Sequence, residues 1–260
     1  MRKLRFEEFE RNSLTVFAIS MIANVLSYLY QIVMGNMLTP ADYGTVNTLL
    51  SLSAVVGVPS GVVAALTATY TAKYHAHGET AALAAFMHRM LRAAAVLAAA
   101  VFAVGALLSL PIAHVLQIDE PWYVTTVMIL VASNCLGPVF SSTLQGVKRF
   151  VPYSMNSVLS FALRLLLGTA FVWLGWGIAG ALAALILSAC LAMLYCLYKS
   201  RDLFFAPKTE QLHLDRDEVR RYFVSTFWFQ LFLLLMANGD VLLIKTFAAD
   251  PAEVGIYSSG

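Results

Sequence analysis

Three charged side chains lie within long apolar stretches of the sequence, where charges are rare: Arg164, Asp240 and Lys245. An unpaired charge at the centre of a bilayer costs about 2.5–3.5 kcal/mol on insertion scales, which makes each of them a candidate functional residue. Arg164 is suited to phosphate, because a guanidinium donates two parallel hydrogen bonds that a lysine ammonium cannot reproduce. The alternative role for Arg164 is an ion pair with Asp240.

Asp240 and Lys245 each allow two interpretations. Asp240 is either a coupling site for a proton or another cation, or a counter-charge to a basic residue. Lys245 stands near the end of its apolar stretch, where its long aliphatic stem lets the ammonium reach the membrane surface. We favour this surface position for Lys245, with a place in a binding pathway as the alternative.

Neutral polar residues form two further rows. Asn24, Ser27 and Gln31 share one face of the stretch 14–37 at helical spacing, and Asn134 and Gln145 repeat the pattern in the stretch 122–145. Amides and hydroxyls in hydrocarbon are costly unless they meet partners or water. Such rows are either interhelical hydrogen-bonding groups, which are common in helix bundles, or the wall of a water-filled cavity.

Enzyme motifs are missing from the sequence. It contains no Gly-x-Ser-x-Gly, no phosphate-binding glycine loop with Lys-Ser/Thr and no Rossmann fingerprint. His75 and His77 form a His-x-His, but only Glu79 stands near them at ligand spacing. We therefore expect no catalytic site, no metal site and no cofactor.

The elements that position these residues are long hydrophobic helices. Hydrophobic residues make up 60% of the chain, charged residues only 12%, and the mean hydropathy is +0.74. A transmembrane helix needs about 20 mostly apolar residues. Seven stretches have this length: 14–37, 46–72, 93–116, 122–145, 152–174, 178–198 and 222–247. The sequence therefore predicts an all-α, polytopic transmembrane helical bundle and excludes a soluble domain.

Two segments carry local predictions. Pro59, between Gly57 and Gly61, frees a backbone carbonyl and predicts a kink in its helix, serving either close packing or a bend that moves. The segment 73–92 predicts a solvated loop that leads into a short Ala-rich helix.

Basic residues are distributed unevenly over the predicted loops. Most of the 17 Lys and Arg residues fall in the N-terminal arm and in every second connection. The alternate connections contain no basic residue and hold Asp42, Asp119, Glu120, Asp250 and Glu253. Because cytoplasmic loops carry the excess of Lys and Arg, we expect a cytoplasmic N-terminus in the inner (cytoplasmic) membrane. The net charge of +2 follows from this bias and implies no nucleic-acid partner.

The segment Pro40–Gly44 has a similar copy, Pro251–Gly255, at an offset of 251 − 40 = 211 residues. Each copy follows a long apolar stretch, which predicts an internal repeat of long period. Parallel repeats of this kind occur in transporters whose two halves rock around a central site. We expect residues 1–200 to form a six-helix lobe, 201–221 a cytoplasmic linker, and 222–260 the start of a second lobe. The chain is then a truncated piece of a protein about twice the repeat length.

Four motifs follow one another along the chain: Leu38–Gly44, Leu144–Phe150, Gly175–Ala181, and Asn238–Lys245 followed by Pro251–Tyr257. In this order they resemble the polysaccharide-flippase (Wzx-like) branch of the MOP exporter superfamily. The resemblance implies a MOP/MATE-like two-lobe transporter with a V-shaped central cavity. It also implies that lipid-linked (undecaprenyl-diphosphate) oligosaccharide crosses the membrane by alternating access, for surface polysaccharide export.

The implied partners are the lipid bilayer, the lipid-linked glycan and a coupling proton or sodium ion. The candidate cavity residues are those singled out above: Arg164, Asp240, Lys245, Asn24, Ser27, Gln31, Asn134 and Gln145.

Two other functions stay open. One is a cation-coupled small-molecule (MATE-like) exporter of the same fold, and the other is a non-transporting membrane scaffold or a polymerase. The first span, 14–37, contains no Asp or Glu of the kind that the antiporters use, and no Arg cluster of the kind that peptidoglycan-precursor flippases carry. Polysaccharide export is therefore the better fit.

Overall fold

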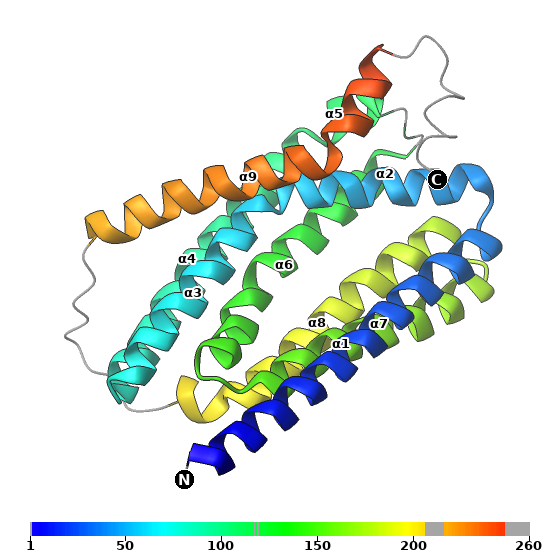
Figure 1. Cartoon of the computed structure of the whole chain (residues 1–260). Coiled ribbons are helices and arrows are strands. Elements are labelled where there is room, and N and C mark those ends of the chain that lie inside the picture. Colours follow the sequence, from blue (N-terminus) through cyan, green and yellow to red (C-terminus); the bar gives the residue numbers. More distant parts are fainter. Residues whose placement is uncertain (1, 117, 119, 206–215, 248–260) are drawn as a thin grey trace. The chain divides into compact units, whose positions relative to one another are not determined.

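The computed structural model describes residues 2–116, 118, 120–205 and 216–247, and excludes the side chains of residues 2–13 and of parts of the last helix. The regular structure of these residues is entirely helical (Figure 1). The chain divides into two compact units, Met1–His213 and Leu214–Gly260. The first contains α1 (Arg2–Met37), α2 (Pro40–Val56), α3 (Val58–Ala76), α4 (Thr80–Leu107), α5 (Ser109–Val115), α6 (Pro121–Gly146), α7 (Phe150–Trp173) and α8 (Gly177–Phe204). The second contains α9 (Arg216–Phe247).

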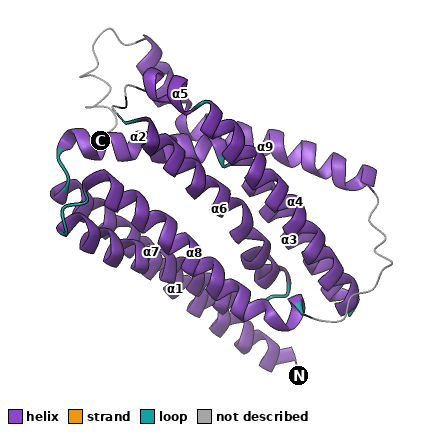
Figure 2. Ribbon diagram, turned by 180° about the vertical axis from the view of Figure 1, so that it is seen from behind, coloured by secondary structure: helices purple, strands orange, loops and turns teal. Residues whose placement is uncertain are grey.

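The helices of the first unit pack as two groups, which can be followed in Figures 1 and 2. One group consists of α1, α7 and α8, and the other of α3, α4 and α6. The groups meet mainly where α6 packs on α8, and α2 contacts both of these helices. A tightly packed core therefore lies within each group and along the α6–α8 contact.

The predicted transmembrane bundle is confirmed. Five helices of the described residues are long and apolar enough to cross a membrane, or six if α2 and α3 form one bent span. These six correspond to the first six predicted stretches. The seventh, 222–247, coincides with α9, which is not among the spans found in the described residues. Large apolar side chains such as Leu107, Leu166 and Trp173 are 67–81% exposed, as expected for surfaces that face lipid.

The predicted kink at Pro59 is confirmed as a break. α2 ends at Val56, α3 begins at Val58, and their axes differ by 49°. Proline lacks the N–H that would continue the hydrogen-bond ladder. The backbone is satisfied locally instead, because Gly57 N–H donates to the Ser53 carbonyl at 2.9 Å and Ser60 N–H donates to the Gly57 carbonyl at 2.9 Å.

The segment 73–92, predicted as a solvated loop leading into a short Ala-rich helix, contains only a short turn, and its helix is not short but continues as α4. α3 runs to Ala76, a short turn contains Gly78 at φ +73°, and α4 starts at Thr80, 13 residues before the predicted span. The early turns of α4 are amphipathic rather than uniformly apolar. Leu83 and Phe86 are 1% exposed and pack inward, and the ring of Phe86 lies 5.6 Å from that of Tyr70 on α3.

The turn before α2, within Leu38–Gly44, is a helix cap by its geometry. The Thr39 hydroxyl accepts a hydrogen bond from Asp42 N–H at 3.2 Å and donates to the Asp42 carboxylate at 2.8 Å, while Pro40 occupies the first helical turn. Thr and Pro at these positions satisfy free N–H groups and pre-set the backbone angle. The second copy of this segment, Pro251–Gly255, lies outside the described residues.

Candidate functional site

Arg164 lies near the middle of α7, where α7 packs on α1. Its guanidinium stands over the ring of Tyr30, 5.2 Å from the ring centre, and 5.8 Å from the ring of Phe161. The side chain is half-buried. Within the described residues it has no carboxylate partner and no hydrogen bond. A cation over an aromatic face gains about 0.5–2 kcal/mol, which leaves the donors of the guanidinium free for an anion.

Tyr30 is the platform for Arg164. The tyrosine is 5% exposed, and its hydroxyl is buried without a hydrogen-bond partner among the described residues. Its ring packs against Gly168 of α7, where a Cβ atom would stand 3.1 Å from the ring. The close approach of α1 to α7 at Gly168 thus brings two unsatisfied polar groups, one phenol and one guanidinium, to a single helix contact.

A cavity of about 440 Å³ lies between the two helix groups. We call it the Ser/Asn cavity after its polar lining, which includes Ser53, Ser60, Ser133, Asn134, Asn156 and Ser160. The break between α2 and α3 opens onto it, since Ser53, Gly57 and Ser60 all line it. Irregular backbone at membrane depth is tolerated where it lines such a cavity.

α7 connects the cavity to Arg164. Asn156 and Ser160 line the cavity, and Arg164 and Gly168 follow at the same four-residue spacing. At 1.5 Å of rise per residue, Ser160 lies about 6 Å and Asn156 about 12 Å before Arg164 along the helix. A ligand bound at Arg164 therefore has a neutral polar region within one to two helical turns.

The other predicted site residues lie in three places. Asn134 lines the Ser/Asn cavity, whereas Gln145 is exposed in the last turn of α6. Asn24 and Gln31 are exposed, Ser27 is half-buried, and none of the three lines this cavity. The structure thus places Asn134 on the same cavity as Asn156 and Ser160 of α7, whereas Arg164 of α7 contacts Tyr30 and does not line it, and the polar face of α1 lies on the outside of the first unit.

Asp240 and Lys245 belong to the last turns of α9, and their side chains lie outside the described ones. Their predicted roles, including the ion pair between Arg164 and Asp240, stay predictions.

Sequence reasoning missed Tyr30 and Asn156. Asn156 was detectable, because Asn156, Ser160, Arg164 and Gly168 recur at every fourth position. Tyr30 gave no comparable signal, since an aromatic residue in an apolar span is usually a packing residue.

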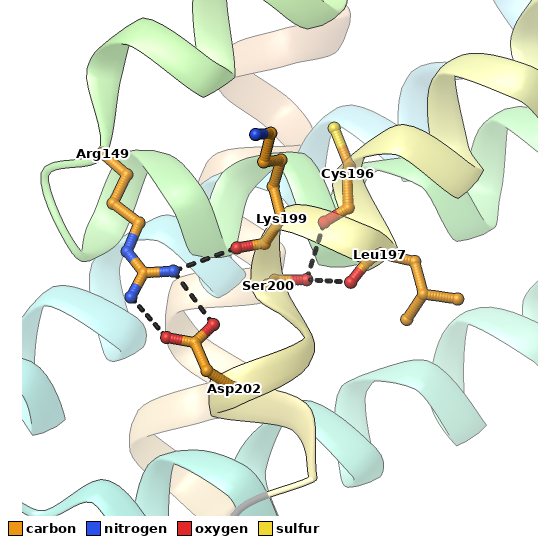
Figure 3. Close-up of polar contacts among 6 residues, drawn as sticks. All are labelled: Arg149, Cys196, Leu197, Lys199, Ser200 and Asp202. Atoms are coloured by element: carbon orange, nitrogen blue, oxygen red, sulfur yellow. Dashed lines mark hydrogen bonds and ion pairs between the residues drawn. The ribbon is translucent and has the colours of Figure 1, made fainter.

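A separate polar contact closes the end of the first unit (Figure 3). Arg149 Nη1 donates to Asp202 Oδ1 at 3.0 Å and to the Lys199 carbonyl at 3.0 Å, and Nη2 donates to Asp202 Oδ2. The hydrogen bond to Asp202 raises the pKa of Arg149 above its ordinary value. The tight turn before it contains Lys148 at φ 62°, and Arg149 N–H donates to the Leu144 carbonyl at 2.8 Å. The motif Leu144–Phe150 is thereby explained as a turn that fixes α6 and α7 to the end of α8.

Known transporter structures share the fold of this chain. The chain resembles a MOP superfamily transporter from Pyrococcus furiosus Vc1, whose binding pocket is described as of reverse polarity and suggestive of a different function. The TM-score is 0.71 at 15% identity, over 95% of this chain and 58% of that one. An outward-facing multidrug resistance MATE family transporter gives 0.70 at 17% identity, over 95% and 58%. The Vibrio cholerae MATE transporter VcmN in its bent form gives 0.63 at 15% identity, over 96% and 60%.

The chain thus spans about 58–60% of the length of these structures. No curated protein sequence matches it significantly.

Residues 9–260 match the family described as polysaccharide biosynthesis protein. The shared fold and the long apolar helices indicate a multi-pass membrane protein. The predicted MOP/MATE-like architecture is confirmed by the shared fold. The chain belongs to the polysaccharide biosynthesis protein family.

Proposed function

We propose that this chain is part of a transporter that flips lipid-linked oligosaccharide, carried on undecaprenyl diphosphate, across the cytoplasmic membrane. Its family membership supports a role in polysaccharide biosynthesis, and its fold supports a transporter. In this proposal residues 1–200 form one lobe, 201–221 the linker, and 222–260 the beginning of the second lobe. The N-terminus lies on the cytoplasmic side, where the basic loops are placed by charge.

One observation carries the proposal: the half-buried guanidinium of Arg164, supported on the ring of Tyr30, has no anionic partner in the described residues. A cation at this depth is costly unless something neutralises it. A diphosphate supplies that charge and matches the forked geometry of a guanidinium. The prenyl tail needs no protein pocket, because it can remain in the surrounding lipid.

Alternating access gives the site a use in transport. Two lobes that rock around a site near the bilayer midplane expose it first to one side of the membrane and then to the other. Arg164 then holds the headgroup during the exchange, and the neutral polar residues provide a hydrated route. Asp240 is the candidate coupling residue for a proton or sodium ion, with the counter-charge role as its alternative, and Lys245 is placed at the membrane surface.

A cation-coupled small-molecule exporter is the second candidate, because two of the three structures named above are MATE transporters, one described as a multidrug resistance protein. The positive charge of Arg164 favours the first candidate, the flippase of lipid-linked oligosaccharide. Arg164, near the middle of the α7 span Phe150–Trp173, is a cation and suits an anionic ligand, and the α1 span Leu14–Met37 holds no Asp or Glu.

The test uses the intact protein in cells whose surface polysaccharide depends on it. Arg164→Lys and Arg164→Ala should both reduce export at least about tenfold while membrane abundance is preserved, because neither side chain forms the bidentate contact. If Arg164 instead pairs with Asp240, Arg164→Ala should lower abundance and the added Asp240→Ala should restore it. Normal export by Arg164→Ala at normal abundance would contradict both roles.

A further inference from the structure

We propose that the Ser/Asn cavity binds the first uncharged sugars of the glycan, next to the diphosphate at Arg164. This inference rests on the proposed function and extends it, because it gives the substrate a chemical class. It assigns to the cavity a sugar whose hydroxyls are neutral, and it disfavours acidic sugars such as uronates.

The charge of the lining supports a neutral ligand. Among the described residues, those that line the cavity include no Asp, Glu, Lys, Arg or His. A cation taken from water into such a site would lack the carboxylate that usually offsets its desolvation, and a carboxylate-bearing sugar would lack a cation. A polyol has no formal charge to desolvate, so its transfer into the cavity costs less.

The hydrogen-bond pattern of the lining supports a ligand that donates. Ser53 donates its hydroxyl hydrogen to the Leu50 carbonyl at 2.7 Å, Ser60 to Gly57 at 2.6 Å, and Ser133 to Ile129 at 2.9 Å. Each of these hydroxyls already donates its one hydrogen, and the lone pairs of its oxygen remain able to accept a hydrogen bond. The wall formed by α2, α3 and α6 is therefore rich in acceptors, which match the hydroxyl hydrogens of a sugar.

Asn156 supplies the unsatisfied group. Its Oδ1 atom is buried and has no hydrogen-bond partner in the described part of the chain, and the residue lines the cavity. A buried acceptor left unpaired costs about 1–3 kcal/mol. A ligand hydroxyl that donates to Oδ1 would recover this cost, so occupied and empty states differ at this atom.

Position and size agree with a sugar that is attached to a bound diphosphate. Ser160 and Asn156 stand about one and two helical turns before Arg164 on α7, some 6 Å and 12 Å along its axis. The first sugar is bonded directly to the diphosphate, so it falls within the nearer distance and the second sugar within the farther one. The volume of about 440 Å³ is within the range of roughly 300–1,000 Å³ for small-molecule sites.

Three soluble probes separate the sugar from the diphosphate. Farnesyl methyl diphosphate carries the diphosphate diester alone, a second probe replaces the methyl group by glucose, and a third replaces it by glucuronate. Their dissociation constants are measured on the 260-residue chain in lipid nanodiscs. We expect the glucosyl probe to bind about tenfold more tightly than the methyl probe, as two additional neutral hydrogen bonds would give. The glucuronyl probe should bind more weakly than the glucosyl probe.

Variants then locate the preference. Asn156→Ala combined with Ser160→Ala should bring the glucosyl probe to the affinity of the methyl probe and leave the methyl probe unchanged. Asn36→Ala is the matched amide control, because Asn36 is exposed, donates to the Ile32 carbonyl and does not line the cavity. It should leave all three affinities unchanged.

The outcomes distinguish this inference from the proposed function. Arg164→Ala should weaken all three probes, and if it weakens none while the sugar preference persists, the diphosphate role fails and the cavity role stands. Equal binding of the glucosyl and methyl probes would overturn the inference and leave the cavity as a hydrated space only. A sugar preference that the double variant leaves unchanged would overturn the inference as well. So would a preference that is seen in sodium buffer and disappears when choline replaces sodium, because the cavity would then hold a cation.

Discussion

The guanidinium of Arg149, in the turn before α7, donates to both carboxylate oxygens of Asp202, 53 residues later in the last turn of α8. The same guanidinium donates to the Lys199 carbonyl, so it also caps a free backbone acceptor at the helix end. This bidentate ion pair between Arg149 and Asp202 thus fixes the α6–α7 turn to the C-terminal end of α8. It leaves the two ends of the α7–α8 hairpin fixed, one by this ion pair and the other by the short Gly175–Gly177 turn.

The first prediction concerns the strength of this ion pair. The Arg149 and Asp202 side chains are 40% and 51% exposed, so solvent screening limits their coupling to about 0.2–1 kcal/mol. A double-mutant cycle with Arg149→Ala and Asp202→Ala, read from the unfolding free energy in bicelles, should give this coupling at low salt and less at high salt. Arg149→Lys should lose most of this coupling free energy, because an ammonium cannot form the bidentate contact with the carboxylate. No measurable coupling at low salt would show that the contact contributes only position.

The second prediction concerns the Tyr30 hydroxyl. Tyr30→Phe keeps the ring under Arg164 and against Gly168, so abundance in the membrane should not change. If the buried hydroxyl donates to the diphosphate, the variant should bind farnesyl methyl diphosphate about tenfold more weakly. Tyr30→Leu should in addition lower abundance, since it removes the ring. A Phe variant that binds this probe like the wild type would assign the hydroxyl no part in the site.

The third prediction concerns helix contact at Gly146. A Cβ atom there would lie 2.7 Å from the Thr71 side chain and 2.8 Å from the Ala68 carbonyl oxygen, and that backbone atom cannot easily move. Gly146→Ala should therefore destabilise the α3–α6 contact by about 1–3 kcal/mol. Gly44→Ala is the matched control, since nothing lies within 4 Å of its Cβ position, and it should be neutral or stabilise α2 by up to about 1 kcal/mol. Equal unfolding midpoints for the two variants would contradict the packing.

The fourth prediction concerns orientation. Single cysteines at Thr39 and Glu120 should react with an impermeant thiol reagent in intact cells, and those at His77 and Thr209 only after permeabilisation. Thr39, His77 and Glu120 are exposed in the structure, so failure to react would not reflect burial in the first unit. The background replaces Cys135, Cys190 and Cys196. The reverse labelling pattern would invert the proposed topology.

The positions of the helices were largely predictable, because the length of an apolar run is set by the thickness of the bilayer. The exception is the start of α4. In these turns the sequence mixes buried apolar residues, Leu83 and Phe86, with the basic residues Arg89 and Arg92. The mean hydropathy there is too low to predict a span, although the helix continues. Hydropathy finds the part of a helix that faces lipid and misses a part that packs on protein at the membrane edge.

The site was predictable only along single helices. The four-residue spacing of Ser160, Arg164 and Gly168 marks one face of α7, but periodicity cannot tell which helix covers that face. The neighbour is α1, through Tyr30 rather than through its polar row at Asn24 and Gln31. Contacts between distant segments, such as Arg149 with Asp202, depend on the order in which helices pack, and no local pattern encodes it.

The break at Gly57 has a mechanical consequence. Ser53 on one side of the break and Ser60 on the other both line the Ser/Asn cavity, so the width of the cavity and the angle between α2 and α3 change together. A sugar held between the two segments would stiffen this joint, and an empty cavity would leave it compliant. The bent span would then act as a lever, because a small change of angle at Gly57 displaces the far end of α2 by several ångströms while the hydrogen-bonded segments on either side stay intact.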